Sequence, residues 1–124
     1  MKIYVCHTTS FDYQQELYRP LKQSSLNKEH QIILPHFEGP EMFDSKSLLP
    51  SVNLVVAEVS FLSTSMGIEI GWANMLQKPI VFIYKESTKP SRSLKAVSEN
   101  FIEYANSEDM VQKLQEFIQG LKTK

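Results

Sequence analysis

Short runs of β-branched and aromatic residues constrain the fold of this chain more than any other feature of its sequence. Each run is almost continuously apolar rather than alternating, a pattern typical of strands that are buried on both faces of a parallel sheet. A weaker run at residues 101–104 (FIEY) predicts an edge strand. The four stronger runs cover residues 2–6 (KIYVC), 31–34 (QIIL), 54–59 (LVVAEV) and 79–84 (PIVFIY).

Helical patterns lie between these runs. The first helix is expected from Asp12 onward, and Pro20 is expected to kink or end it. Apolar spacing predicts a helix at residues 66–76 and a closing helix with Ser107 as its N-cap and two acidic residues in its first turn. Strands that alternate with helices imply right-handed crossovers between parallel strands. We therefore predict a single domain over residues 1–124: a small doubly wound α/β fold, Rossmann-like or flavodoxin-like, with about five parallel strands and helices on both faces.

Composition narrows the functions open to this domain. The 124 residues include 13 lysines and arginines against 14 aspartates and glutamates, for a formal charge of -1, and no segment is a block of like charge. A nucleic-acid polymer is therefore not an expected partner. The one cysteine, Cys6, cannot form an internal disulfide. Neither a membrane-spanning apolar run nor a signal peptide is evident, so we expect a cytoplasmic protein without a membrane partner.

The loops after the strands are the places to search for chemistry, because open parallel sheets bind ligands beyond the carboxyl ends of their strands. The loop after the first strand reads His7-Thr8-Thr9-Ser10 and lacks the glycines of a dinucleotide fingerprint or a Walker loop. NAD and ATP sites of those forms are excluded. Hydroxyl and N–H groups at a helix start can still hold a phosphate, with ordinary turn and capping roles as the alternative.

The segment after the third strand combines a hydroxyl-rich loop with the start of a helix. Ser63, Ser65 and the N–H groups near Gly67 are expected to form a cradle for an anion at this helix end. Glu69 would stand at the rim of the cradle. The alternative is that Glu69 is a surface residue in the first helical turn, where a carboxylate compensates the helix dipole.

Other ionisable residues are less informative. Glu58 interrupts the third apolar run and is expected either to tie loop N–H groups or to belong to the site. Asp44 and Glu41 precede that strand and are further acids within reach. The histidines and the cysteine lack metal-ligand spacing, so no metal site is expected. No Gly-x-Ser-x-Gly elbow indicates a serine hydrolase.

The central motif resembles a known family. Residues 54–59, followed by Ser63, Gly67, residues 69–71 (EIG) and residues 78–80 (KPI), resemble the nucleoside 2-deoxyribosyltransferase superfamily. The motif looks closest to the 2'-deoxynucleoside 5'-monophosphate N-glycosidase branch. The resemblance implies hydrolysis of the N-glycosidic bond of such a nucleotide, with a small deoxynucleotide or deoxynucleoside as substrate and no cofactor.

The resemblance also implies roles for individual residues. Glu69 takes the position of the carboxylate that attacks the anomeric carbon and forms a covalent glycosyl-enzyme intermediate. Tyr4 matches a tyrosine that orients this carboxylate, with a buried strand tyrosine as the alternative. Ser63 stands where transferases of unphosphorylated nucleosides have an aspartate. Because a carboxylate there would repel a phosphate, the serine favours a 5'-phosphate, which Thr8 and Ser65 would also contact.

The chain departs from the family pattern at several positions. Asn53 replaces an aspartate, and Ser45 stands where relatives have a catalytic acid. Asp44 is the candidate acid, although a shift of one residue on a helix turns the side chain by about 100°. Ser93, within residues 91–95 (SRSLK), matches a segment that reaches the phosphate pocket of a neighbouring subunit.

Two other functions stay open at this point. One is a deoxyribosyltransferase that passes the sugar to a second base, and the other is a noncatalytic nucleotide-binding module. The resemblance further implies a homodimer or a higher homo-oligomer with shared sites. Trp72 and Met75 are candidates for the subunit interface, unless they pack on the sheet.

Overall fold

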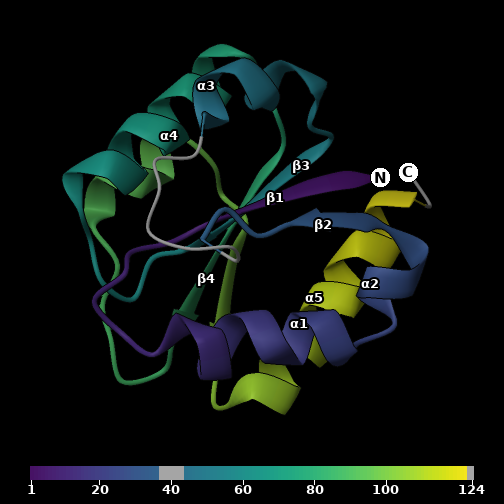
Figure 1. Cartoon of the computed structure of the whole chain (residues 1–124). Helices are drawn as coiled ribbons and strands as arrows, with labels where there is room; N and C mark the ends of the chain where they lie inside the picture. Colours follow the sequence, from purple (N-terminus) through teal and green to yellow (C-terminus); the bar gives the residue numbers. More distant parts are fainter. Residues whose placement is uncertain (37–43, 123–124) are drawn as a thin grey trace.

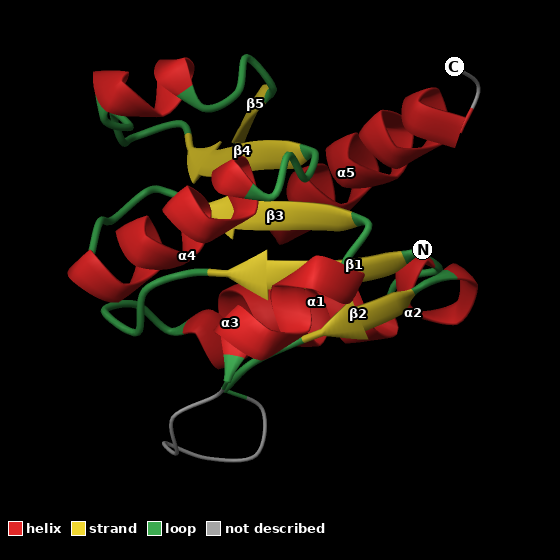
Figure 2. Ribbon diagram, turned by 90° about the horizontal axis from the view of Figure 1, so that it is seen from above, coloured by secondary structure: helices red, strands yellow, loops and turns green. Residues whose placement is uncertain are grey.

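A parallel sheet forms the centre of the computed structural model, which describes residues 1–36 and 44–122 (Figure 1). Within these residues the sheet has five strands in the order β2-β1-β3-β4-β5, which Figure 2 shows from above. This order is that of flavodoxin-like doubly wound folds, so the predicted fold class is confirmed. The strands are β1 (Lys2–Cys6), β2 (Gln31–Ile33), β3 (Leu54–Glu58), β4 (Ile80–Lys85) and, at one edge, β5 (Phe101–Tyr104).

Helices cover both faces of the sheet, as predicted (Figures 1 and 2). One face packs against the π-helical turn η1 (Gln14–Tyr18) and the helices α1 (Arg19–Gln23), α2 (Leu26–Glu29) and α5 (Ser107–Lys122). The other face packs against α3 (Ser45–Leu48), α4 (Thr64–Met75) and the 3-10 helices η2 (Leu49–Ser51) and η3 (Arg92–Ala96).

The burial of the strands explains their unbroken apolar sequence. Every residue of β3 is buried, because helices lie above and below it. Val56 belongs to the core on the α1 and α5 side, whereas Val55 belongs to the core on the α3 and α4 side. Tyr4 in β1 pairs with Val55, and its side chain lies in the same core as α4. This alternation brings Tyr4 to the helix that carries Glu69.

Two helix starts differ from their predicted positions. Helix α4 begins at Thr64, and the Ser63 hydroxyl caps it by accepting from the Met66 N–H at 3.3 Å. Helix α5 is capped by Asn106, whose side-chain oxygen accepts from the Asp109 N–H at 2.9 Å. The predicted cap, Ser107, instead donates its hydroxyl to a carbonyl of η1. Apolar periodicity marks the buried face of a helix but not the polar turn that precedes it, so it places helix starts too late.

Pro20 does not end the first helix. The π-helical turn η1 runs directly into α1, and Pro20 lies in the first turn of α1. Pro20 has no N–H to donate to the carbonyl of Glu16, four residues earlier, and this carbonyl accepts instead from the Ser107 hydroxyl at 3.1 Å. The irregular part of the helix, the π-helical turn η1, therefore lies directly before the turn that contains the proline.

Candidate active site

A cleft of about 530 Å³ opens at the carboxyl ends of β1, β2 and β3. It lies where the chain reverses its strand order between β1 and β3, the expected place for a ligand in this class of sheet. Loops after three strands and the first turns of α4 form its walls. The lining residues are His7, Thr8, Thr9, Ser10, Tyr13, His36, Leu62, Ser63, Ser65 and Glu69.

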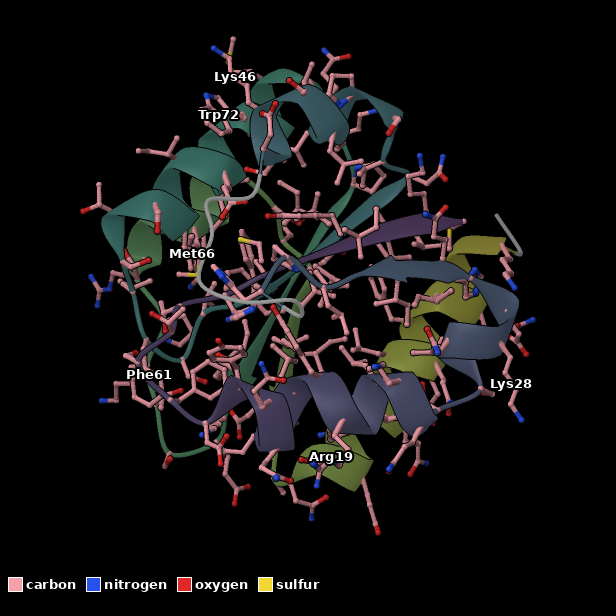
Figure 3. All side chains as sticks on the ribbon, viewed as in Figure 1. Arg19, Lys28, Lys46, Phe61, Met66 and Trp72 are labelled. Atoms are coloured by element: carbon pink, nitrogen blue, oxygen red, sulfur yellow. The ribbon has the colours of Figure 1, made fainter. Side chains whose placement is uncertain are left out.

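A second hollow of about 500 Å³ lies between α1 and α5, away from the strand ends. Its charged side chains include Arg19 (labelled in Figure 3) and Glu108, and both are exposed. The first cleft differs because it contains a half-buried carboxylate with a buried partner. We therefore take the first cleft as the candidate site.

Tyr4 and Glu69 form the central pair of this site. The Tyr4 hydroxyl donates a hydrogen bond to Glu69 Oε2, and the Tyr4 side chain is 1% exposed. Burial and the neighbouring Glu69 carboxylate raise the pKa of Tyr4 far above its ordinary value. The hydroxyl therefore keeps its proton and can only orient the carboxylate. Glu69 lines the cleft together with the hydroxyl-bearing residues of two loops.

Glu69 is not a residue of the first helical turn. Because α4 begins at Thr64, Glu69 lies in the second turn, and no acidic residue occupies the first. The interpretation of Glu69 as a dipole-compensating surface residue is therefore wrong. Because α4 starts earlier than predicted, no acidic side chain in its first turn compensates the positive end of the helix dipole, which faces the preceding loop.

The hydroxyl groups expected around an anion divide into those at the cleft and those elsewhere. Ser63 and Ser65 line the cleft at the N-terminus of α4, and their hydroxyl oxygens lie 3.5 Å apart. Gly67 does not line it, and its N–H donates to the Ser63 carbonyl at 3.1 Å. The available N–H groups belong instead to Thr64 and Ser65, which precede the first intrahelical donor. Ser93 lies on η3 and does not line the cleft of its own chain.

The loop after β1 completes the polar side of the cleft. Thr8 Oγ1 and Ser10 Oγ are 2.9 Å apart, and both residues line the cleft. Among the described residues that line the cleft there is no lysine or arginine. An anion here would therefore be held by hydroxyl groups, by N–H groups and by the dipole of α4.

Asp44 does not lie at the cleft. Its exposed carboxylate caps α3 by accepting from the Ser47 N–H at 3.2 Å, and hydrogen bonding with the Ser47 side chain and then with this N–H lowers the pKa of Asp44. A general acid needs the opposite shift, so the position of Asp44 does not support that role. Ser45, the next residue, is buried and hydrogen-bonds Tyr4. The structure thus brings Ser45 and not Asp44 to the central pair, and Glu41 lies outside the described residues.

Glu58 is a structural tie, one of the two roles expected for it. Its buried carboxylate accepts from the Ser60 N–H at 2.6 Å, from the Ser60 hydroxyl at 3.0 Å and from the Tyr104 hydroxyl. The Lys85 N–H in turn donates to the Ser60 hydroxyl at 2.8 Å. These bonds join the ends of β3, β4 and β5 to the loop that leads into α4.

Sequence reasoning missed the contacts that join the segment after β1 to the loop before α4, two of the segments that form the cleft. Lys85 Nζ lies 2.8 Å from Glu16 Oε1 and over the rings of Phe11 and Phe61. Phe61, labelled in Figure 3, is in the loop before α4, and Phe11 follows β1. Their ring centroids are 5.9 Å apart. No local pattern indicates such a cluster, because its members come from two loops, the π-helical turn η1 and the end of β4.

Two aromatic residues of the cleft, Tyr13 and His36, were also not predicted. Both are half-buried, and their ring centroids are 5.9 Å apart. They follow β1 and β2, so their place beyond the strand ends was the only signal that could have found them.

The comparisons with known proteins agree with this architecture. No protein-family model matches the chain, and no curated protein matches it either. Among solved structures, the CMP N-glycosidase BcmB of Clostridium botulinum matches with a TM-score of 0.68 at 20% identity, over 93% of this chain and 99% of that chain. The 2-deoxyribosyltransferase of Leishmania mexicana matches with a TM-score of 0.54 at 14% identity, over 67% of this chain and 63% of that one. The chain has the fold of the nucleoside 2-deoxyribosyltransferases. The resemblance inferred from the central motif is thus confirmed at the level of fold.

Two further observations apply to the described part of the chain. No group of three or more histidines, cysteines, aspartates and glutamates there is arranged to hold a metal ion. No helix there has the length and apolar character that a bilayer crossing requires.

The tie at Glu58 predicts a loss of stability in the variant Glu58→Gln. The amide nitrogen cannot accept, so at least one buried N–H or O–H group loses its partner, and the free energy of unfolding should fall by about 1–3 kcal/mol. Urea denaturation of purified protein measures this change. Glu103→Gln is the matched control, because Glu103 is exposed and accepts one 3.3 Å bond from Tyr84. Equal losses in the two variants would contradict a special role for Glu58.

Proposed function

We propose that this chain hydrolyses the N-glycosidic bond of a 2'-deoxynucleoside 5'-monophosphate, with Glu69 as the nucleophile. The observation that carries the proposal is the Glu69 carboxylate, which is held by the buried Tyr4 hydroxyl at the wall of a cleft rich in hydroxyl groups. The fold shared with a CMP N-glycosidase and a 2-deoxyribosyltransferase supports it. No metal or cofactor enters the mechanism.

The first step is attack of the carboxylate on the sugar. Tyr4 binds Oε2 of Glu69, which leaves Oε1 to form the bond to the anomeric carbon. As that bond forms, the bond to the base nitrogen breaks and its electron pair leaves with the base, which takes up a proton from solvent. The negative carboxylate stabilises the oxocarbenium-like transition state, as in retaining glycosidases.

The second step releases the sugar. A water molecule attacks the anomeric carbon, its proton goes to solvent, and the bond to Glu69 breaks to give deoxyribose 5-phosphate and the free carboxylate. Hydrolysis and transfer share the first step and differ only in whether water or a second base attacks.

The polar side of the cleft favours a phosphorylated substrate. Ser63 and Ser65 sit at the open N-terminus of α4, and Ser10 stands on the facing loop. Hydroxyl groups and the positive end of a helix dipole attract a phosphate, whereas a carboxylate at Ser63 would repel it. We therefore place the 5'-phosphate at this side and the base toward Tyr13 and His36, whose rings can contact a planar ligand.

Replacement of the nucleophile tests the mechanism. Glu69→Gln should lower base release at least about a thousandfold, because an amide is a poor nucleophile. Chromatography of reactions with deoxynucleosides, their monophosphates and CMP measures the liberated base. CMP is included because BcmB is named for it.

Glu99→Gln is the matched control for this variant. Glu99 is exposed and precedes β5, at the edge of the sheet opposite the cleft. The control should keep wild-type activity, and Glu69→Gln should still be stabilised thermally by the nucleotide. Base release by Glu69→Gln at the wild-type rate would reject the nucleophile assignment.

A second free base in the reaction distinguishes the three candidate functions. With dCMP and adenine together, we expect free cytosine and deoxyribose 5-phosphate without an exchanged nucleotide. Formation of dAMP would show that the chain is a transferase. Thermal stabilisation by nucleotides without any base release would instead show a noncatalytic binding module.

We also propose that the chain forms a homodimer through the outer face of α4. Met75 is 82% exposed and Ile68 is 47% exposed, so apolar residues lie on this outer face as well as on the buried one. Trp72 is half-buried and packs against the core, with Lys46 Nζ 5.7 Å from its ring (both labelled in Figure 3), so packing on the sheet accounts for it. Of the two residues expected at an interface, only Met75 is largely exposed.

A charge on this face tests the dimer. Met75→Glu should convert a dimer to a monomer in light scattering after size exclusion, because the interface would have to bury an unpaired carboxylate. Lys28→Glu, at an exposed position of α2 on the opposite face of the sheet, is the control and should leave the oligomeric state unchanged. A wild-type protein that is monomeric at high concentration would contradict the proposal.

A further inference from the structure

Tyr18 does not line the cleft, yet its hydroxyl joins two of the segments that do. The side chain is 1% exposed and belongs to η1. Its oxygen accepts a hydrogen bond from the backbone N–H of His36 at 3.0 Å and lies 2.6 Å from His7 Nε2. His7 follows β1 and His36 follows β2, so one hydroxyl group connects the carboxyl ends of two adjacent strands.

The partners of His7 determine which ring nitrogen carries its proton. His7 Nδ1 lies 2.6 Å from the carbonyl oxygen of Thr8, which can only accept, so Nδ1 carries the hydrogen. In a neutral ring Nε2 is then an acceptor, and it receives the hydrogen of the Tyr18 hydroxyl. Burial lowers the pKa of His7 to about 4, and burial also raises the pKa of Tyr18. At pH 7 the Tyr18 hydroxyl therefore donates to His7 Nε2 and accepts from the His36 N–H, while His7 Nδ1 donates to the Thr8 carbonyl.

The same ring supports both sides of the cleft. Its centroid lies 4.7 Å from that of Tyr13 and 5.3 Å from that of His36, two further ring-bearing residues of the cleft wall. The Thr8 carbonyl that it binds belongs to the hydroxyl-bearing loop, in which Thr8 contacts Ser10. One buried ring thus contacts the aromatic wall and the polar loop at once.

We propose that Tyr18 is a positioning residue of the nucleotide site, because its hydroxyl binds both His7 Nε2 and the His36 N–H and thereby fixes the aromatic wall and the hydroxyl loop. The effect on substrate rests on the proposed function, whereas the tautomer does not. Without the Tyr18 hydroxyl, His7 Nε2 and the His36 N–H would both lose a partner. The Tyr4–Glu69 pair is held separately by β1 and α4, so substrate binding should suffer more than the chemical step.

Nitrogen NMR of the wild-type protein with labelled histidine tests the tautomer directly. At pH 7 the signals of His7, identified by their loss in His7→Asn, should show a protonated Nδ1 and an unprotonated Nε2. A spectrum of the Nε2–H tautomer or of the charged ring would overturn the proposal. This measurement needs no activity and no Tyr18 variant.

The variant Tyr18→Phe tests the positioning role. The His7 Nε2 signal should shift, because that nitrogen loses its hydrogen-bond donor while the Thr8 carbonyl keeps the proton on Nδ1. KM for the nucleotide should rise at least about fivefold while kcat changes less than about twofold. Tyr84→Phe is the control, because it removes a hydroxyl that donates to Glu103 at 3.3 Å and lies outside the cleft. It should change neither quantity.

The outcomes separate this proposal from the proposed function. An unchanged KM together with an unchanged His7 spectrum in Tyr18→Phe would reject the positioning role. A wild-type protein that releases no base would reject the proposed function alone. Thermal stabilisation by dCMP then replaces KM in the comparison of Tyr18→Phe with Tyr84→Phe, and equal stabilisation of the two variants would reject the positioning role.

Discussion

The hydrogen bond from the buried Tyr4 hydroxyl to the Glu69 carboxylate is the interaction on which the candidate site depends. It joins a central strand to the second turn of α4 and gives the carboxylate a defined orientation at the cleft wall. Burial keeps the proton on Tyr4, so the hydroxyl is the donor and Oε2 of Glu69 the acceptor in this bond. A carboxylate on a surface turn of the same helix would have no such partner.

Separate contacts keep the surrounding loops in place. Glu58 ties the start of the loop before α4 to β5, and Lys85 joins that loop to the segment after β1 through two phenyl rings and Glu16. Tyr18 links the ends of β1 and β2. In each of these ties, a buried or half-buried polar group has a specific hydrogen-bond or ion-pair partner. Such partners hold the loops at the edge of the sheet in one conformation. The cleft is therefore formed by residues that follow several strands, and no single sequence motif contains them all.

Several features of the site were predictable from sequence, and the errors have local causes. The hydroxyl-rich loop before α4 and Glu69 were found because they form one continuous segment. The start of α4 was placed too late, and this one error made Glu69 look like a first-turn residue and Gly67 like a free donor. Asp44 was chosen for its chemistry, whereas the fold uses its carboxylate as a helix cap and turns Ser45 inward.

Local apolar patterns and chain connectivity were enough to predict the strands, the parallel sheet and the edge at which a ligand can bind. Which side chains meet at that edge became clear from the folded structure. Tyr4 and Glu69 are 65 positions apart, and Lys85 and Glu16 are 69 positions apart. Such pairs depend on the order of the strands and on the face that each side chain takes, and no local pattern of the chain records either.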